Sequence, residues 1–331
     1  MQSFLVDGKI SKQGSNAIKG MAILFMVIHH TVLRLGDTYT ALLPSIAVDA
    51  LGGALRMCVP LFVFVSGYGL MRTNVQTRQQ IVKRLFSVFK IYVLCVGIVF
   101  IGRYCFGDPV EWNGWRVFIG NITGLHKVVT GWESGWLTSW WYIPVAYLLI
   151  LIAPLWTQWT KRYGWNMFIA TLILPILLNA KYDGADLMLP WLPVYTLGML
   201  CADRNLTPRQ VSHPVLTGLL AFLGMFGLHY FLVKLSGFSL FYRFSFCLPF
   251  ALYFIYVVCQ SKVLMRLLVG FGKISFPLYL VHNLFLNQSF IMDLSQYHWL
   301  LPSMVALILS VPIGIVVTRI GGKIKCPKQL L

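Results

Sequence analysis

KGMAILFMVIHHTVLR, residues 19–34, decides the fold class, because it is apolar enough to form most of a membrane helix. The run opens with a cation, Lys19, and closes near two histidines, His29 and His30. Ionisable groups inside hydrocarbon are costly, so they usually face a cavity and mark a functional path. Lys19 and His30 would lie on nearly the same helix face, roughly 16 Å apart along the axis. The stretch therefore predicts chemistry inside the bilayer.

The composition extends this prediction to the whole chain. Of the 331 residues, 58% are hydrophobic and only 11% are charged, and the mean hydropathy is +0.73. Soluble domains carry about 25% charged residues. We therefore predict an all-α, polytopic membrane helix bundle in which residues 1–331 form a single integral membrane domain without a soluble domain. Apolar runs of about 20 residues predict about ten transmembrane helices, at residues 17–35, 50–71, 88–107, 137–157, 165–180, 188–202, 214–234, 240–259, 270–290 and 299–319.

The charged residues predict the orientation of these helices. With the N-terminus in the cytoplasm, most of the 27 lysines and arginines fall inside, whereas only two of the ten acidic residues, Asp7 and Asp203, do so. The positive-inside rule therefore places both the N- and the C-terminus in the cytoplasm. The net charge of +17 reflects this topology, and nothing supports binding of nucleic acid. No removable signal peptide is expected, and the seven cysteines have no metal-ligand spacing, so no metal site is predicted.

His30 is the leading candidate for a general base, because a neutral imidazole can take a proton from a hydroxyl. His29 precedes it and Arg34 follows one turn later, so both could line the same pore. The competing interpretation is that the two histidines only form hydrogen bonds to neighbouring helices. Two adjacent histidines above a buried lysine favour the functional interpretation.

Two segments near the predicted cytoplasmic side carry further candidates. Ser66 and Tyr68 lie beside a glycine in MCVPLFVFVSGYGLMR (57–72) and could line a pocket, although small-residue packing explains most Ser-Gly pairs in membrane helices. RQQIVKRLFSVFKIY (78–92) is rich in cations that could hold the phosphates of a nucleotide-bearing donor. These cations are Arg78, Lys83, Arg84 and Lys90. The alternative is that they only set orientation or meet anionic lipid.

GFGKISFPLYLVHNLFL (270–286) places another histidine within the membrane. Ser275 and His282 are two turns apart on one helix face with Tyr279 nearby, so they could share a cavity with the first helix. Structural hydrogen bonding is the alternative. The longest connection, residues 108–136, is predicted to lie outside and is rich in tryptophan. It could be a re-entrant segment or cap over a cavity, or only an interfacial belt.

These same segments resemble the acyltransferase-3 family of integral membrane proteins, which acylate sugars and cell-envelope glycans. The family opens with Asp-x-x-Arg-Gly, a hydrophobic run and a histidine; here NAIKG (16–20) begins the pattern, and its spacing registers His30 on the catalytic histidine of the family. Three further motifs follow in family order and extend the resemblance over nearly the whole chain: VPLFVFVSGYGL (59–70), KRLFSVFKIY (83–92) and GKISFPLYLVH (272–282).

The chain departs from the family pattern at three positions. Asn16 stands where an acid is usual, Lys19 replaces arginine, and Ser87 replaces the second arginine of a basic pair, leaving Arg84 alone. Lysine keeps the positive charge but loses the bidentate fork of arginine. These departures bear on donor identity and rate.

The resemblance implies a membrane O-acyltransferase, most simply an O-acetyltransferase, of a cell-surface polysaccharide or lipid-linked sugar. The donor would be cytoplasmic acetyl-CoA or another acyl-CoA, with no permanently bound cofactor. His30 would deprotonate the acceptor hydroxyl, while Lys19 and Arg84 would bind the donor or stabilise developing negative charge. Trp141 and Tyr142 could stack on the sugar rings of the acceptor. The expected location is the inner membrane of a bacterium, in contact with membrane lipids.

Two other functions remain open at this stage. A sugar transporter or permease fits ten spans and charges within the membrane equally well, so only the ordered motifs favour an enzyme. A non-catalytic scaffold descended from the enzyme would fit the departures at Asn16 and Ser87.

Overall fold

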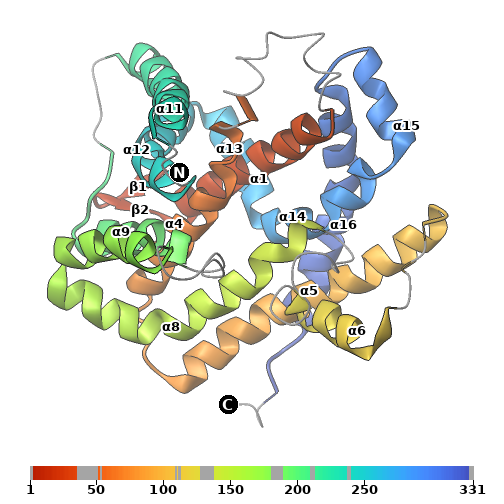
Figure 1. The fold of residues 1–331 in the computed structure, drawn as a ribbon, viewed down its shortest axis with the longest axis horizontal. Coiled ribbons are helices and arrows are strands. Elements are labelled where there is room, and N and C mark those ends of the chain that lie inside the picture. The colour runs from red at the N-terminus through yellow and green to blue at the C-terminus, as the bar shows by residue number, and fades with distance from the viewer. Residues whose placement is uncertain are drawn as a thin grey trace. The chain divides into compact units, whose positions relative to one another are not determined.

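The computed structural model describes residues 3–35, 51–52, 54–108, 110, 113–126, 138–179, 189–208, 213–236 and 240–327 (Figure 1). In these residues the regular structure is helical apart from one short hairpin. The chain divides into two compact units: unit 1 is Met1–Val75 with Ala153–Lys273, and unit 2 is Gln76–Ile152 with Ile274–Leu331. The single domain expected from the sequence stays a prediction.

Unit 1 begins with an antiparallel hairpin and otherwise consists of helices. Its elements are β1 (Leu5–Val6), β2 (Lys9–Ile10), α1 (Lys12–Leu35), α4 (Cys58–Arg72), α9 (Trp165–Asn179), η4 (Leu189–Trp191), α10 (Leu192–Asp203), α11 (Pro214–Ser236), α12 (Leu240–Val258) and α13 (Lys262–Lys273). Within it, α1 packs on α13 and α4, α10 packs on α4, and α11 packs on α12.

Unit 2 is built around α14, which packs on both α5 and α16. Its elements are α5 (Arg78–Cys105), α6 (Gly114–Thr123), η2 (Thr138–Trp141), α14 (Ser275–Leu286), α15 (Ser289–Met292), η5 (Asp293–Gln296) and α16 (Leu301–Lys323). The helix α8 (Tyr142–Tyr163) contributes its first half to unit 2 and its second half to unit 1.

The helices confirm a membrane helix bundle. Five are long and apolar enough to cross a bilayer, and a sixth span is possible if α13 and α14 are taken together. These five are α1, α5, α8, α16 and residues 214–231 of α11; α4 and parts of α9 and α12 are shorter apolar helices. Each of the ten predicted spans overlaps a helix, but the number of crossings and the cytoplasmic location of both termini stay predictions.

Two predicted boundaries need correction. The third span was expected to start at residue 88, but α5 already starts at Arg78, because Thr77 and Gln80 form a capping box. The Thr77 hydroxyl accepts a hydrogen bond from the Gln80 N–H at 3.3 Å, and the Gln80 side chain accepts one from the Thr77 N–H at 3.1 Å. The ninth span, 270–290, is interrupted at Ile274, where α13 has ended and α14 begins.

Glycines in α1 and α13 let the backbones of these two helices come into direct contact. A Cβ atom on Gly20 of α1 would overlap the backbone carbonyl of Leu268 in α13, and one on Gly272 of α13 would overlap the carbonyl of Asn16 in α1. The NAIKG segment and the glycine that opens GKISFPLYLVH are therefore packed against each other. In membranes, where apolar burial drives helix association weakly, such close approach is a main source of helix contact.

Segments of unit 1 that are predicted to be cytoplasmic contact one another. The Thr207 hydroxyl, beyond the end of α10, donates to the Gly8 carbonyl of the hairpin at 3.1 Å. The Lys161 ammonium, near the end of α8, donates to the Asn74 side chain at 2.9 Å. Because these segments follow different helices, their contacts agree with a shared membrane face; which face this is stays a prediction.

The connection predicted to lie outside folds back along α5 in unit 2. The Tyr92 hydroxyl donates a hydrogen bond to the carbonyl of Asn121 in α6, and Tyr92 lies thirteen residues before Cys105, about 20 Å along the helix axis. The helix α6 then ends at Gly124, whose φ of 76° is the left-handed conformation of a C-cap. The described part of 108–136 therefore favours a re-entrant segment over a flat belt; residues 127–136 lie outside the described residues.

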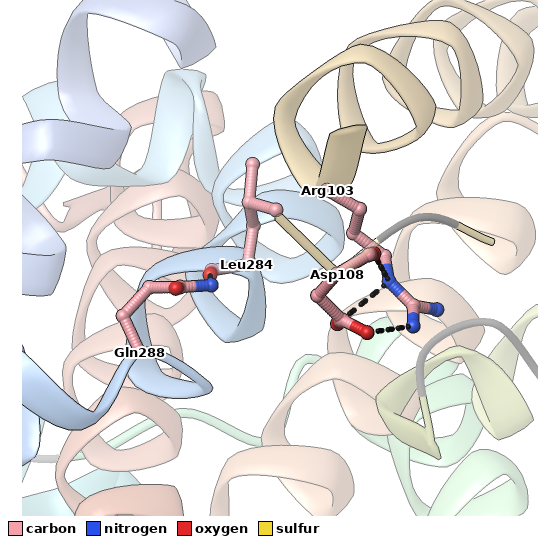
Figure 2. Close-up of polar contacts among 4 residues, drawn as sticks. All are labelled: Arg103, Asp108, Leu284 and Gln288. Atoms are coloured by element: carbon pink, nitrogen blue, oxygen red, sulfur yellow. Dashed lines mark hydrogen bonds and ion pairs between the residues drawn. The ribbon is translucent and has the colours of Figure 1, made fainter. Parts of the chain in front are cut away.

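The C-terminal end of α5 is closed by an ion pair (Figure 2). The Arg103 Nη2 and Nε atoms donate to the two carboxylate oxygens of Asp108 at 2.8 and 3.0 Å, and Nε also donates to the Asp108 carbonyl. A Cβ atom on the neighbouring Gly102 would meet the side chain of Leu284 in α14. The Leu284 carbonyl accepts a hydrogen bond from Gln288 at 3.1 Å, which closes the end of α14.

Candidate functional site

The two histidines of α1 occupy different environments. His29 is buried, whereas His30 is partly exposed, and their ring centroids lie 5.5 Å apart. The Arg34 Nη1 donates a hydrogen bond to the His30 carbonyl at 3.2 Å, so Arg34 stabilises the last turn of the helix. Of the pair, His30 is therefore the more exposed residue.

Lys19 lies on the same face of α1 as His30. Because α1 is continuous from Lys12 to Leu35, the two side chains keep the predicted separation of roughly 16 Å along the axis. Ile23 and Met26 lie between them on this face, and both are buried. The half-buried Lys19 has no carboxylate partner among the described residues. A cation without a carboxylate partner, one turn before the apolar residues Ile23 and Met26 on the same helix face, is suited to an anionic or polarised ligand.

Ser66 and Tyr68 of α4 use their hydroxyls for local structure. The Ser66 hydroxyl donates to the Phe62 carbonyl of its own helix at 2.8 Å. The hydroxyl of Tyr68, a buried residue, accepts a hydrogen bond from the Ile10 N–H of the hairpin at 2.9 Å. A Cβ atom on Gly67 would overlap the Tyr195 carbonyl of α10. These contacts favour the packing interpretation of this segment.

The basic segment forms the first turns of α5 in unit 2. Arg78 and Lys83 are exposed, Arg84 is partly exposed, and the Lys90 ammonium donates to the Ile324 carbonyl at 2.8 Å. The hydroxyl of Ser87, which replaces the second arginine of the family pattern, donates to the Lys83 carbonyl at 2.8 Å. Cations near a helix N-terminus oppose the helix dipole, and an anion bound there would relieve this repulsion. The start of α5 is therefore suited to phosphate groups.

The candidates of α14 all lie in the core of unit 2. Ser275, Tyr279 and His282 are buried. The His282 Nδ1 lies 3.1 Å from the Leu278 carbonyl and 2.9 Å from the Tyr279 carbonyl, so this nitrogen carries the proton. This side chain therefore contributes to the structure of its own helix.

Aromatic side chains from three elements gather around α14. The Tyr142 ring meets the Tyr279 ring edge-on at 6.3 Å, so the structure brings together two predicted acceptor residues. Trp140 was not among the predicted residues; it is fully buried, and its indole N–H donates to the Leu280 carbonyl at 3.0 Å. The Trp140 ring packs edge-on against Tyr92 at 5.2 Å, whereas Trp141 is partly exposed. Apart from Trp141, these aromatic side chains are buried and pack the core around α14.

The predicted residues are thus distributed over both units. His29, His30, Lys19, Arg34, Ser66 and Tyr68 belong to unit 1, and the other nine belong to unit 2. Within unit 1, the histidine pair and Lys19 share one helix, as predicted. Within unit 2, the cations share the start of α5, and Tyr142 contacts Tyr279. In the sequence, Trp140 and Tyr92 appear only as aromatic residues within apolar runs. Such residues are common in ordinary protein cores, so nothing in the sequence marked these two as site residues.

Comparisons with known proteins identify the family. The family model of the acyltransferase-3 group, described as an acyltransferase domain, matches residues 12–319, nearly the whole chain. Neither the curated proteins nor the solved structures gave a match. The match includes α1 with its histidine pair, the basic start of α5 and the buried α14. The chain therefore belongs to the acyltransferase-3 family and is a multi-pass membrane acyltransferase that transfers groups other than aminoacyl groups.

Proposed function

We propose that this enzyme is an O-acyltransferase that moves an acyl group, most simply acetyl, from cytoplasmic acyl-CoA to a hydroxyl of a cell-surface polysaccharide or lipid-linked sugar. The observation that carries the proposal is the partly exposed His30 on the same face of α1 as the unneutralised Lys19. A partly exposed histidine and a cation on one face supply a base and a positive charge for the anionic donor. The family match supplies the reaction class.

The proposed reaction is a direct acyl transfer. A ring nitrogen of His30 takes the proton of the acceptor hydroxyl while the hydroxyl oxygen attacks the thioester carbonyl. The tetrahedral intermediate collapses, the bond from the acyl carbon to sulfur breaks, and the thiolate of coenzyme A leaves. The proton held by His30 then passes to this thiolate. Lys19 lies roughly 16 Å from His30 along α1, so its positive charge would act on the anionic donor, as would the charge of Arg84, and not on the tetrahedral intermediate.

The donor would be recognised by its phosphates. Arg78, Lys83 and Arg84 lie in the first two turns of α5, where the free N–H groups and the helix dipole also favour anions. These residues support acyl-CoA as the donor.

The acceptor would be recognised by stacking. The partly exposed Trp141 would supply the aromatic face; its ring packs edge-on against the buried Tyr142, which in turn packs against the buried Tyr279. Sugar rings present C–H groups on one face and hydroxyls at their edges, which fits amphipathic aromatic side chains. This arrangement supports a sugar acceptor. A location in the inner membrane of a bacterium is part of the same proposal.

The test is acyl transfer by purified protein in lipid nanodiscs. Acetyl-CoA labelled in the acetyl group is supplied with and without a soluble glycan acceptor, and release of coenzyme A and label on the glycan are both measured. We expect His30→Ala and His30→Gln to lose at least a hundredfold in kcat, because general base catalysis contributes about 10²–10⁴-fold. His213→Ala is the matched control, since His213 is an exposed histidine outside the candidate residues. Unchanged turnover in His30→Ala would contradict the proposal.

The transporter remains the second candidate function. The interruption between α13 and α14 is of the kind found in transporters with broken helices. In proteoliposomes, a transporter would accumulate labelled sugar without acetyl-CoA. Sugar uptake in the absence of donor, equal in wild type and His30→Ala, would favour this function over acyl transfer.

A further inference from the structure

A cleft in unit 1 lies outside the candidate catalytic residues. Its volume is about 730 Å³, within the range of small-molecule sites in proteins. The hairpin, the first turn of α1, the end of α12 and the start of α13 form its walls. The lining residues are Ser3, Phe4, Leu5, Gln13, Tyr256, Cys259, Gln260, Lys262, Met265 and Arg266. None of the fifteen predicted site residues is among them.

The charge of this cleft is positive. Lys262 and Arg266 are four residues apart in α13, so they share one face of the helix, and both line the cleft. No acidic residue is among the described lining residues. The first turn of α13 adds further attraction for an anion. The Ser261 hydroxyl accepts a hydrogen bond from the Leu264 N–H at 3.5 Å. The N–H groups before Leu264 in this turn have no acceptor within the helix, so they can donate to an anion.

The rest of the cleft combines an apolar wall with amide groups. Phe4 and Met265 are buried, and the Phe4 ring meets the Tyr256 ring edge-on at 5.6 Å. The Oε1 atom of Gln13 is buried and accepts no hydrogen bond from the residues that the structure describes. A buried acceptor without a partner is costly, so a ligand that donates an N–H or O–H group there would be stabilised. The Gln260 amide also lines the cleft.

We propose that this cleft binds a phosphate ester that also carries an apolar part and a hydrogen-bond donor. The phosphate would meet Lys262, Arg266 and the first turn of α13. The donor group would reach Gln13, and the apolar part would lie against Phe4 and Met265. Two sources supply this chemistry: a free nucleotide, such as the phosphorylated adenosine of coenzyme A, or the head group of an anionic phospholipid. The proposal does not depend on the acyl-transfer reaction, because it concerns binding alone.

The experiment measures binding of two probes to delipidated, purified full-length protein. Adenosine 3′,5′-bisphosphate is titrated by calorimetry with adenosine as the control without phosphate, and phosphatidylglycerol is counted by native mass spectrometry with phosphatidylcholine as the neutral control. We expect at least one phosphate probe to bind, and the variant with both Lys262→Ala and Arg266→Ala to bind it at least tenfold more weakly. Gln13→Leu should weaken it severalfold. Lys273→Ala removes an exposed cation from the same helix and should change nothing.

The pattern of results decides both the proposal and the source. Binding of only the nucleotide, or of only the lipid, supports the proposal and identifies the source. The proposal is wrong if neither probe binds, or if the double variant binds as tightly as wild type. It is also wrong if binding is lost only when Lys83 and Arg84 of α5 are replaced by alanine, because the phosphate then binds at that helix.

Discussion

The contact between α1 and α13 gives the most direct test of the fold around Lys19. Gly272 has no room for a side chain, because a Cβ atom would overlap the Asn16 carbonyl of α1. Gly270 lies on the same helix, two residues earlier, where no atom of the described residues is within 4 Å of such a Cβ atom. Gly272→Ala and Gly270→Ala therefore add the same methyl group to one helix in opposite surroundings.

The expected magnitudes follow from two opposing effects. Alanine favours a helix over glycine by about 1 kcal/mol, so Gly270→Ala should be neutral or stabilising by up to about that amount. Overpacking in a well-packed core costs about 1–3 kcal/mol, and the upper end applies at Gly272 because a backbone carbonyl cannot rotate away as a side chain can. After the helix gain of about 1 kcal/mol, Gly272→Ala should lose about 2 kcal/mol. The two variants should then differ by about 3 kcal/mol, or more than a hundredfold in the folding equilibrium.

The assay is reversible unfolding in mixed micelles of a mild detergent and sodium dodecyl sulfate, followed by circular dichroism and tryptophan fluorescence. The free energy of unfolding is extrapolated to zero dodecyl sulfate for wild type and both variants. Acyl transfer by Gly272→Ala should fall as well, because the α1 backbone that carries Lys19 must shift. Equal stability of Gly272→Ala and Gly270→Ala would refute the backbone contact.

Three further outcomes follow from single contacts. Lys19→Met should lower kcat/KM at least tenfold while Lys19→Arg, which restores the family residue, retains activity, as steady-state kinetics would show; equal loss in both would contradict a role for the positive charge. Trp140→Phe should destabilise the protein by about 0.5–1.5 kcal/mol in the same unfolding assay, because the Leu280 carbonyl loses the hydrogen bond from the indole N–H and keeps only its helical partner; no change would contradict a contribution of this bond to stability. A double-mutant cycle on Arg103→Ala and Asp108→Ala should give a coupling free energy of no more than about 1 kcal/mol, because the Asp108 side chain is exposed. A coupling free energy well above this value would show that the ion pair is shielded from water.

The sequence predicted α1 well, because an uninterrupted apolar run with polar flanks leaves few alternatives for a membrane segment. The start of α5 was missed because Thr77, Gln80 and the cations after them read as a polar loop. The capping interaction that begins the helix there involves only two side chains. The interruption at Ile274 was missed because the hydropathy stays high across it, and hydropathy does not report a change in helix direction.

The candidate site was predictable only where its residues share one helix. Lys19 and His30 could be placed on one face from their spacing alone. The contact of Tyr142 with Tyr279 could not, because it joins segments far apart in the chain. The same holds for the cleft in unit 1, whose walls come from residues 3–13 and 256–266; Lys262 and Arg266 were explained by topology alone.

The central claim is that His30 acts as the base in acylation of an envelope glycan. Its most direct test is mass spectrometry of envelope glycans from cells that lack the gene and are complemented with wild type or His30→Ala at equal membrane levels. We predict that O-acyl groups disappear on deletion, return with wild type and stay absent with His30→Ala. Full restoration of O-acylation by His30→Ala would contradict the claim.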